Sequence, residues 1–92
     1  MHIIISQKLK TLEKMELNLE QLKAKAAKSS TTIKAGFHKK IKQVEGFINL
    51  CKSTLELAGK QSEASAMEIL SGMAIVWTNL AQSIQSAEAH IS

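Results

Sequence analysis

Apolar residues recur every three or four positions along most of the chain, in three blocks separated by short polar stretches. This spacing is typical of α-helices with one apolar stripe each. The first stripe combines a seven-residue repeat with three flanking residues: Ile5, Leu12, Leu19, Ala26, Leu9, Met15 and Leu22. The second consists of Phe37, Ile41, Val44, Ile48, Cys51, Leu55 and Ala58. The third consists of Ala66, Leu70, Met73, Trp77, Leu80, Ile84, Ala87 and Ile91.

These stripes predict three helices, over about 6–28, 31–58 and 62–91. The second helix is preceded by hydroxyl residues that suit an N-cap, and we expect it to end where Gly59 takes a left-handed conformation. For the third helix, Ser62 is one candidate cap, and Ser65 with Glu68 forms the alternative as an S-x-x-E capping box.

The connections between the blocks are short, so neighbouring helices should be antiparallel. The chain has no proline and only three aromatic residues in 92, a composition that favours long helices. We therefore predict a single all-α domain over residues 1–92. It should be a three-helix antiparallel bundle or an extended helical hairpin, with coiled-coil-like heptad packing.

A second set of apolar residues lies off the three stripes: Ile3, Ile4, Leu17, Ile33, Phe47, Leu50, Leu57, Met67, Ile69, Ile75 and Val76. The third block also carries only one charged residue, Glu68, between Ala64 and Ala87. An apolar surface of this kind usually marks an interaction site. We predict a homo-oligomer or partner interface on the third helix at Ile69, Met73, Val76, Trp77, Leu80 and Ile84, although Trp77 also suits an ordinary core position.

Positive charge is concentrated at the junction of the first two blocks. Residues 23–42 contain seven of the twelve lysines and no acidic residue, and the whole chain has a net charge of +4 without any arginine. In an antiparallel hairpin these residues would meet at one tip and form an anion-binding patch. Its members are Lys23, Lys25, Lys28, Lys34, His38, Lys39, Lys40 and Lys42. The alternative is a solvated tip without a ligand.

The sequence has no catalytic or metal-ligand pattern that we recognise. It contains no aspartate, and its three histidines and eight glutamates are scattered, so we expect neither an enzyme nor a cofactor. The single cysteine, Cys51, lies in an apolar stripe and suits a small buried residue. We see no secretion signal or membrane-spanning run, and we expect a cytoplasmic protein.

These patterns favour a small non-enzymatic protein-binding module, such as an adaptor, an inhibitor or a small chaperone. It would act through self-association and a helix-packing surface. The alternative is a weakly specific nucleic-acid-binding protein that uses the lysine-rich tip at residues 23–42, where the lack of arginine argues against base-specific recognition.

Overall fold

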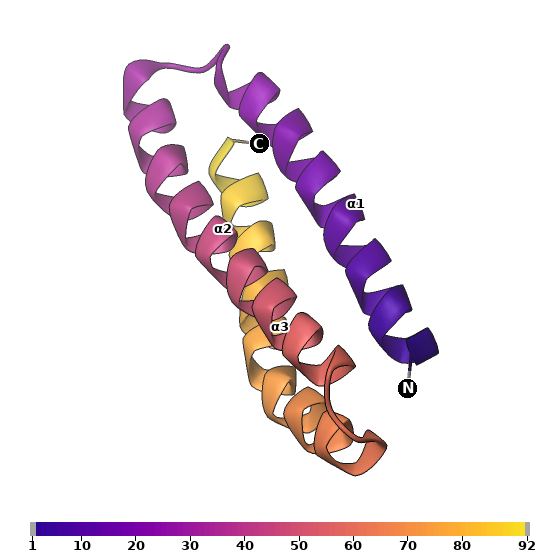
Figure 1. The fold of residues 1–92 in the computed structure, drawn as a ribbon. Coiled ribbons are helices and arrows are strands. Elements are labelled where there is room, and N and C mark those ends of the chain that lie inside the picture. The colour runs from indigo at the N-terminus through magenta and orange to yellow at the C-terminus, as the bar shows by residue number, and fades with distance from the viewer. Residues whose placement is uncertain (1, 92) are drawn as a thin grey trace.

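The computed structural model describes residues 2–91, which form three long helices and no strand. Helix α1 spans His2–Ala26, α2 spans Thr31–Gly59 and α3 spans Glu63–Ile91. Each helix reverses the direction of the one before it, and the molecule is elongated, with principal extents of 49 × 19 × 16 Å (Figure 1). The all-α fold and the three helices that the apolar pattern predicts are confirmed.

Helix α1 begins at His2, before the predicted start near Ser6, and it ends at Ala26 rather than at Lys28. Its first turns are helical because Ile5 packs into the core and no helix-breaking residue precedes it. At its other end the backbone tightens. The amides of Lys28 and Ser29 bond to carbonyls three residues back, at 3.2 and 2.9 Å, instead of four.

The other helix starts are set by serine hydroxyls. Ser30 caps α2, because its Oγ accepts a hydrogen bond from the Ile33 amide at 3.3 Å. Ser62 caps α3 by accepting from the Ser65 amide at 3.4 Å, so the alternative start at Ser65 is not used. The prediction that Gly59 takes a left-handed conformation is wrong. No described glycine has a positive φ, and α2 ends through a right-handed Lys60 whose amide bonds back to the last turn.

The core consists of the predicted stripes. All seven stripe residues of α2 are buried, as are six of the eight on α3, while Leu70 and Trp77 at the α1 side are only partly buried. In α1 the seven-residue repeat and Leu22 are buried, and Leu9 and Met15 are partly covered. The described residues bury no charged side chain in this core.

The three helices are not packed equally. Helices α2 and α3 lie against each other along much of their lengths, whereas α1 contacts α2 less and α3 least (Figure 1). Two contacts give the α2–α3 alignment: Lys40 with Ser86, and Gly36 with His90. In both pairs the residue numbers add up to 126. In an antiparallel pair, residues at the same height along the two helices have the same sum of residue numbers. Leu50 therefore lies level with Val76, and Leu57 with Ile69.

Candidate functional site

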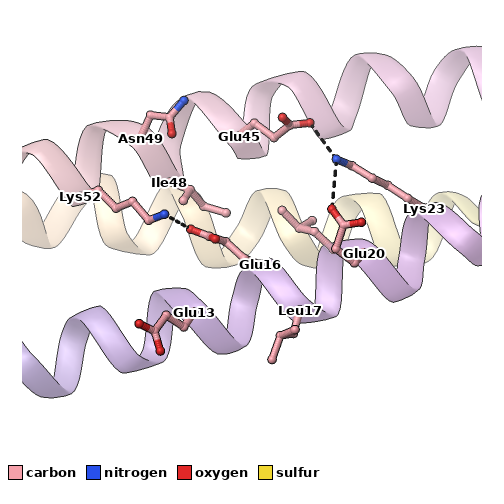
Figure 2. Close-up of a pocket in the computed structure, with 10 residues that line it drawn as sticks. Glu13, Glu16, Leu17, Glu20, Lys23, Glu45, Ile48, Asn49 and Lys52 are labelled. Carbon is pink, nitrogen blue, oxygen red and sulfur yellow. Dashed lines mark ion pairs between the residues drawn. The ribbon is translucent and has the colours of Figure 1, made fainter.

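A shallow groove of about 580 Å³ runs between α1 and α2, and its polar side chains pair across it. Figure 2 shows Lys23 of α1 pointing between Glu20 and Glu45, at 3.6 and 3.5 Å, and Lys52 of α2 reaching Glu16. These side chains remain two-fifths or more exposed. Each lysine already has a carboxylate partner, so these ion pairs join the two helices across the groove, and among the described lining residues Glu13 is the one charged group outside them.

The same ion pairs mark the side of α2 that α1 covers. At about 100° per residue, Leu50 lies roughly 140° from Glu45 and roughly 160° from Lys52 around the helix axis. Leu50 is therefore on the far side from α1, as is Leu57 two turns later. Their exposed fractions, 49% and 52%, agree with this placement. The charged residues of α2 between Gln43 and Leu57 are Glu45, Lys52 and Glu56. Glu45 and Lys52 pair with α1, and Glu56 lies roughly 20° from Glu45 around the axis, so none of the three is on the side of Leu50.

Contacts on α3 give the matching result. Trp77 and Glu88 face α1, since the Lys8 ammonium lies 4.6 Å from the Trp77 ring centroid and Asn18 donates to Glu88 at 3.1 Å. Ile75 lies roughly 160° from Trp77 around the axis, and it is 73% exposed. Together the uncovered sides of α2 and α3 form what we call the open face. It comprises Phe47, Leu50, Leu57, Ile69, Ile75 and Val76.

The structure divides the six residues predicted as an interface. Met73, Leu80 and Ile84 are buried in the core of the closed bundle, so none of them can contact a partner while the helices stay packed. Trp77 lies partly buried beneath Lys8 of α1. Only Ile69 and Val76 lie on the open face. The periodicity could not separate these groups, because buried and partner-facing positions on a helix share the same spacing.

The open face includes residues that the site prediction left out, namely Leu50, Leu57, Ile75 and Phe47. The sequence signal for them was present, because all four are apolar residues off the main stripes. What the sequence lacked was the position of α1. Once α1 covers one side of the α2–α3 pair, the apolar residues that stay exposed or partly exposed on the other side are left without a neighbouring helix.

The eight residues of the lysine-rich tip are brought to one end of the molecule, but they differ in their contacts. Lys23 pairs with Glu20 and Glu45, and Lys40 donates to Ser86 at 2.7 Å. Within residues 2–91, the other six form no ion pair: Lys25, Lys28, Lys34, His38, Lys39 and Lys42. The tip therefore carries more positive charge than its own carboxylates neutralise.

A hollow of about 380 Å³ lies at this tip, between the end of α1 and the first half of α2. Its lining combines three basic residues, one acidic residue and four apolar ones: Lys23, Lys34, His38, Glu45, Ala26, Ala27, Phe37 and Ile41. Sequence reasoning placed the three basic residues in one patch. It assigned Phe37 to the core, where the structure also places it, but did not foresee that an apolar floor would remain beside the charges.

The thiol of Cys51 is buried in the core between the helices. Burial raises the pKa of the Cys51 thiol, and the positive charge of Lys8 partly opposes this effect. A raised pKa leaves less thiolate at neutral pH, so the group is poorly suited to nucleophilic chemistry. The described part of the chain also contains no cluster of three or more His, Cys, Asp or Glu residues that could hold a metal ion.

Among residues 2–91, no helix combines the length and the apolar character that crossing a bilayer requires. Comparison of the chain with protein-family models, with curated proteins and with solved structures found no match. Function must therefore be argued from the two surfaces described above, the open face and the lysine-rich tip.

Proposed function

We propose that this protein is a small non-enzymatic binding module that associates with other helices, first of all with a second copy of itself, through the open face. The observation that carries the proposal is the exposure of three large apolar side chains, Leu50, Leu57 and Ile75, on the sides of α2 and α3 that helix geometry turns away from α1. Burying such apolar area provides the main favourable free energy of association. The adaptor, inhibitor or small-chaperone roles are forms that such binding can take.

A second copy fits the open face for an electrostatic reason. In a two-fold symmetric dimer the same patch meets itself, so any charge at its centre would face a like charge. The centre of the open face, around Leu50 and Val76, has no charged residue, and Glu68 lies toward one end. Two copies could thus extend the helix packing into a four-helix, coiled-coil-like arrangement. The buried thiol of Cys51 suits the reducing cytoplasm, where we place the protein.

The test is the mass of the protein in solution, measured by light scattering on a sizing column at low and moderate salt. We expect a dimer or larger species at both salt concentrations, because apolar association is not screened by ions. The variants Leu50→Glu and Ile75→Glu should reduce the mass to that of a monomer.

Leu17→Glu is the matched control. Leu17 is an apolar residue of α1, 66% exposed, and it lies outside the open face. Its replacement should leave the oligomer intact. A monomer at every concentration, or equal loss of mass in all three variants, would rule out self-association through the open face.

A second candidate function rests on the lysine-rich tip, where seven of the eight basic residues have no ion-pair partner within residues 2–91. Such a surface would bind nucleic acid through its phosphates, with little sequence specificity. Its affinity should fall steeply as salt rises, and replacing Lys34, Lys39 and Lys40 together by glutamine should abolish it. A complex held by the open face would show neither effect.

A further inference from the structure

The hollow at the lysine-rich tip has a charged end and an apolar floor, both on one side of α2. Five lining residues, Lys34, Phe37, His38, Ile41 and Glu45, follow one another at spacings that place them on one helix face. Along this face the basic and apolar residues alternate, in the order Lys34, Phe37, His38 and Ile41, and the carboxylate of Glu45 comes last. A ligand on this face would therefore meet positive charge and apolar surface side by side, away from the carboxylate end.

The two ends of the hollow also differ in how their charges are paired. Glu45 is paired with Lys23 at 3.5 Å, and Lys23 also pairs with Glu20 at 3.6 Å, so the charge of the acidic end is offset only in part. Lys34 and His38 are exposed and form no ion pair within residues 2–91. Lys34 also lies in the first turn of α2, where the aligned peptide dipoles add positive potential. An anion would therefore be held at this end.

The floor of the hollow is fixed by the core. Ala26, Phe37 and Ile41 are buried and pack within the main apolar cluster, while Ala27 forms an exposed wall in the turn after α1. At about 380 Å³ the hollow is near the lower end of the range of roughly 300–1,000 Å³ that is usual for small-molecule sites. Its size suits a short apolar chain rather than a folded partner.

We propose that this hollow binds a small amphiphilic anion, a phosphate monoester that carries a short apolar chain. The phosphate lies at Lys34 and His38, since an ammonium group is a compact partner for phosphate oxygens. The chain lies on Phe37 and Ile41. This site is separate from the open face, and it stands or falls independently of the protein-binding proposal.

The probe is octyl phosphate below its micelle-forming concentration, titrated into the full chain in a calorimeter. Inorganic phosphate and octanol serve as the charge-only and chain-only references. We expect one octyl phosphate per chain, bound at least tenfold more tightly than either reference. Each methylene that the floor buries should contribute about fourfold in affinity, which corresponds to about 0.8 kcal/mol.

Three surface variants locate the site. Lys34→Gln should weaken octyl phosphate binding roughly three- to tenfold, the range for a charged contact at a partly exposed position. Ala27→Leu should abolish binding by filling the hollow without changing its charge. Lys39→Gln removes an equivalent lysine of α2 that does not line the hollow, and it should leave the affinity unchanged.

Each contrary result has a definite meaning. Equal weakening by Lys34→Gln and Lys39→Gln would show attraction to the tip as a whole, as expected for nucleic acid or an anionic membrane, and would overturn the proposal. So would inorganic phosphate binding as tightly as octyl phosphate, or an unchanged affinity in Ala27→Leu. Anionic lipid vesicles are the last probe, and they test whether the tip binds a lipid surface. Binding to vesicles by the native chain and Ala27→Leu alike would assign the tip to a lipid surface instead.

Discussion

The contacts between α2 and α3 differ in kind from the contacts that α1 makes with the two of them. The α2–α3 pair meets through buried apolar and small side chains, and its one cross-helix polar contact among the described side chains is Lys40 with Ser86. Helix α1 contributes a narrower apolar stripe, edged on both sides by exposed polar contacts such as Lys23 with Glu45 and Lys8 with Trp77.

This difference predicts how each part of the fold responds to salt and to mutation. Apolar burial in the α2–α3 pair is insensitive to salt and costly to disturb, whereas exposed ion pairs contribute little and are screened. We therefore expect the α2–α3 pair to be the most stable part of the molecule, and α1 to be the helix that moves most easily.

The largest expected effect comes from shortening a fully buried leucine. Leu80→Ala in α3 and Leu12→Ala in α1 both remove side chains with no exposed area, and each should cost about 2–5 kcal/mol of unfolding free energy. The loss should be larger for Leu80, because the more loosely held α1 can move to close its cavity. Urea unfolding followed by circular dichroism measures both.

Leu17→Ala is the control for this pair, because Leu17 is 66% exposed on α1 and lies outside the open face. In the monomer it should change stability by no more than about 0.5 kcal/mol. If Leu12→Ala proved more costly than Leu80→Ala, the comparison between α1 and the α2–α3 pair would be reversed.

The next effect tests how closely α2 and α3 approach. A β-carbon at Gly36 would lie 2.7 Å from Cε1 of His90, whereas one at Gly46 would meet no atom within 4 Å. Gly36→Ala should therefore leave the protein no more stable than the native chain, and up to about 1 kcal/mol less stable, because the His90 side chain must turn aside to make room. Gly46→Ala should instead stabilise it by about 0.5–1 kcal/mol. The change in thermal unfolding temperature shows directly whether each substitution lowers or raises stability.

A double variant identifies the cause. Gly36→Ala combined with His90→Ala removes the imidazole that the new methyl group would strike, so much of the lost stability should return. If Gly36→Ala alone behaved like Gly46→Ala, the His90 imidazole would not be held against Gly36.

A smaller effect is expected at the ion pairs that edge α1. Glu45→Gln removes the partner of Lys23 across the α1–α2 groove and should cost between 0 and about 1 kcal/mol at low salt. The cost should shrink as salt is raised, because both side chains are partly exposed. Glu56→Gln on the same helix, which removes a glutamate with no ion pair in the described chain, should have no such salt-dependent effect.

The smallest effect concerns pH. Because burial raises the pKa of Cys51, the unfolded chain releases the thiol proton at a lower pH than the folded chain does. The contribution of Cys51 to stability is therefore complete below the ordinary thiol pKa, about 8.5, and is lost as pH rises above it. The unfolding free energy of the native chain should fall between pH 7 and 9.5, relative to that of Cys51→Ala.

The comparison with Cys51→Ala is the control, because it cancels every pH-dependent contribution that the two proteins share and leaves that of the thiol. A pH-independent difference would show that the folded state does not hold Cys51 away from solvent. A thiol reagent gives a second readout: it should react slowly with the native protein and fully in denaturant.

Much of the fold could be predicted from local patterns. The seven-residue stripe of α2 was predicted in full, because a helix that packs on two neighbours buries one continuous set of positions. The helix ends were predicted less well. Ser62 rather than Ser65 starts α3, and a right-handed Lys60 ends α2, because several residues near each end can satisfy the same backbone groups.

The candidate sites, like the fold, combine features that the sequence determines with features that only helix packing decides. The sequence by itself determined the number of helices, their apolar stripes and the clustering of lysines near one turn, since spacing and composition are local properties. Only the tertiary structure decided that Met73, Leu80 and Ile84 lie in the core while Leu50 and Ile75 stay open, and that Phe37 and Ile41 form a floor beside Lys34. The physical reason is that exposure depends on which side of the α2–α3 pair α1 covers, and one helix's periodicity contains no information about its neighbours.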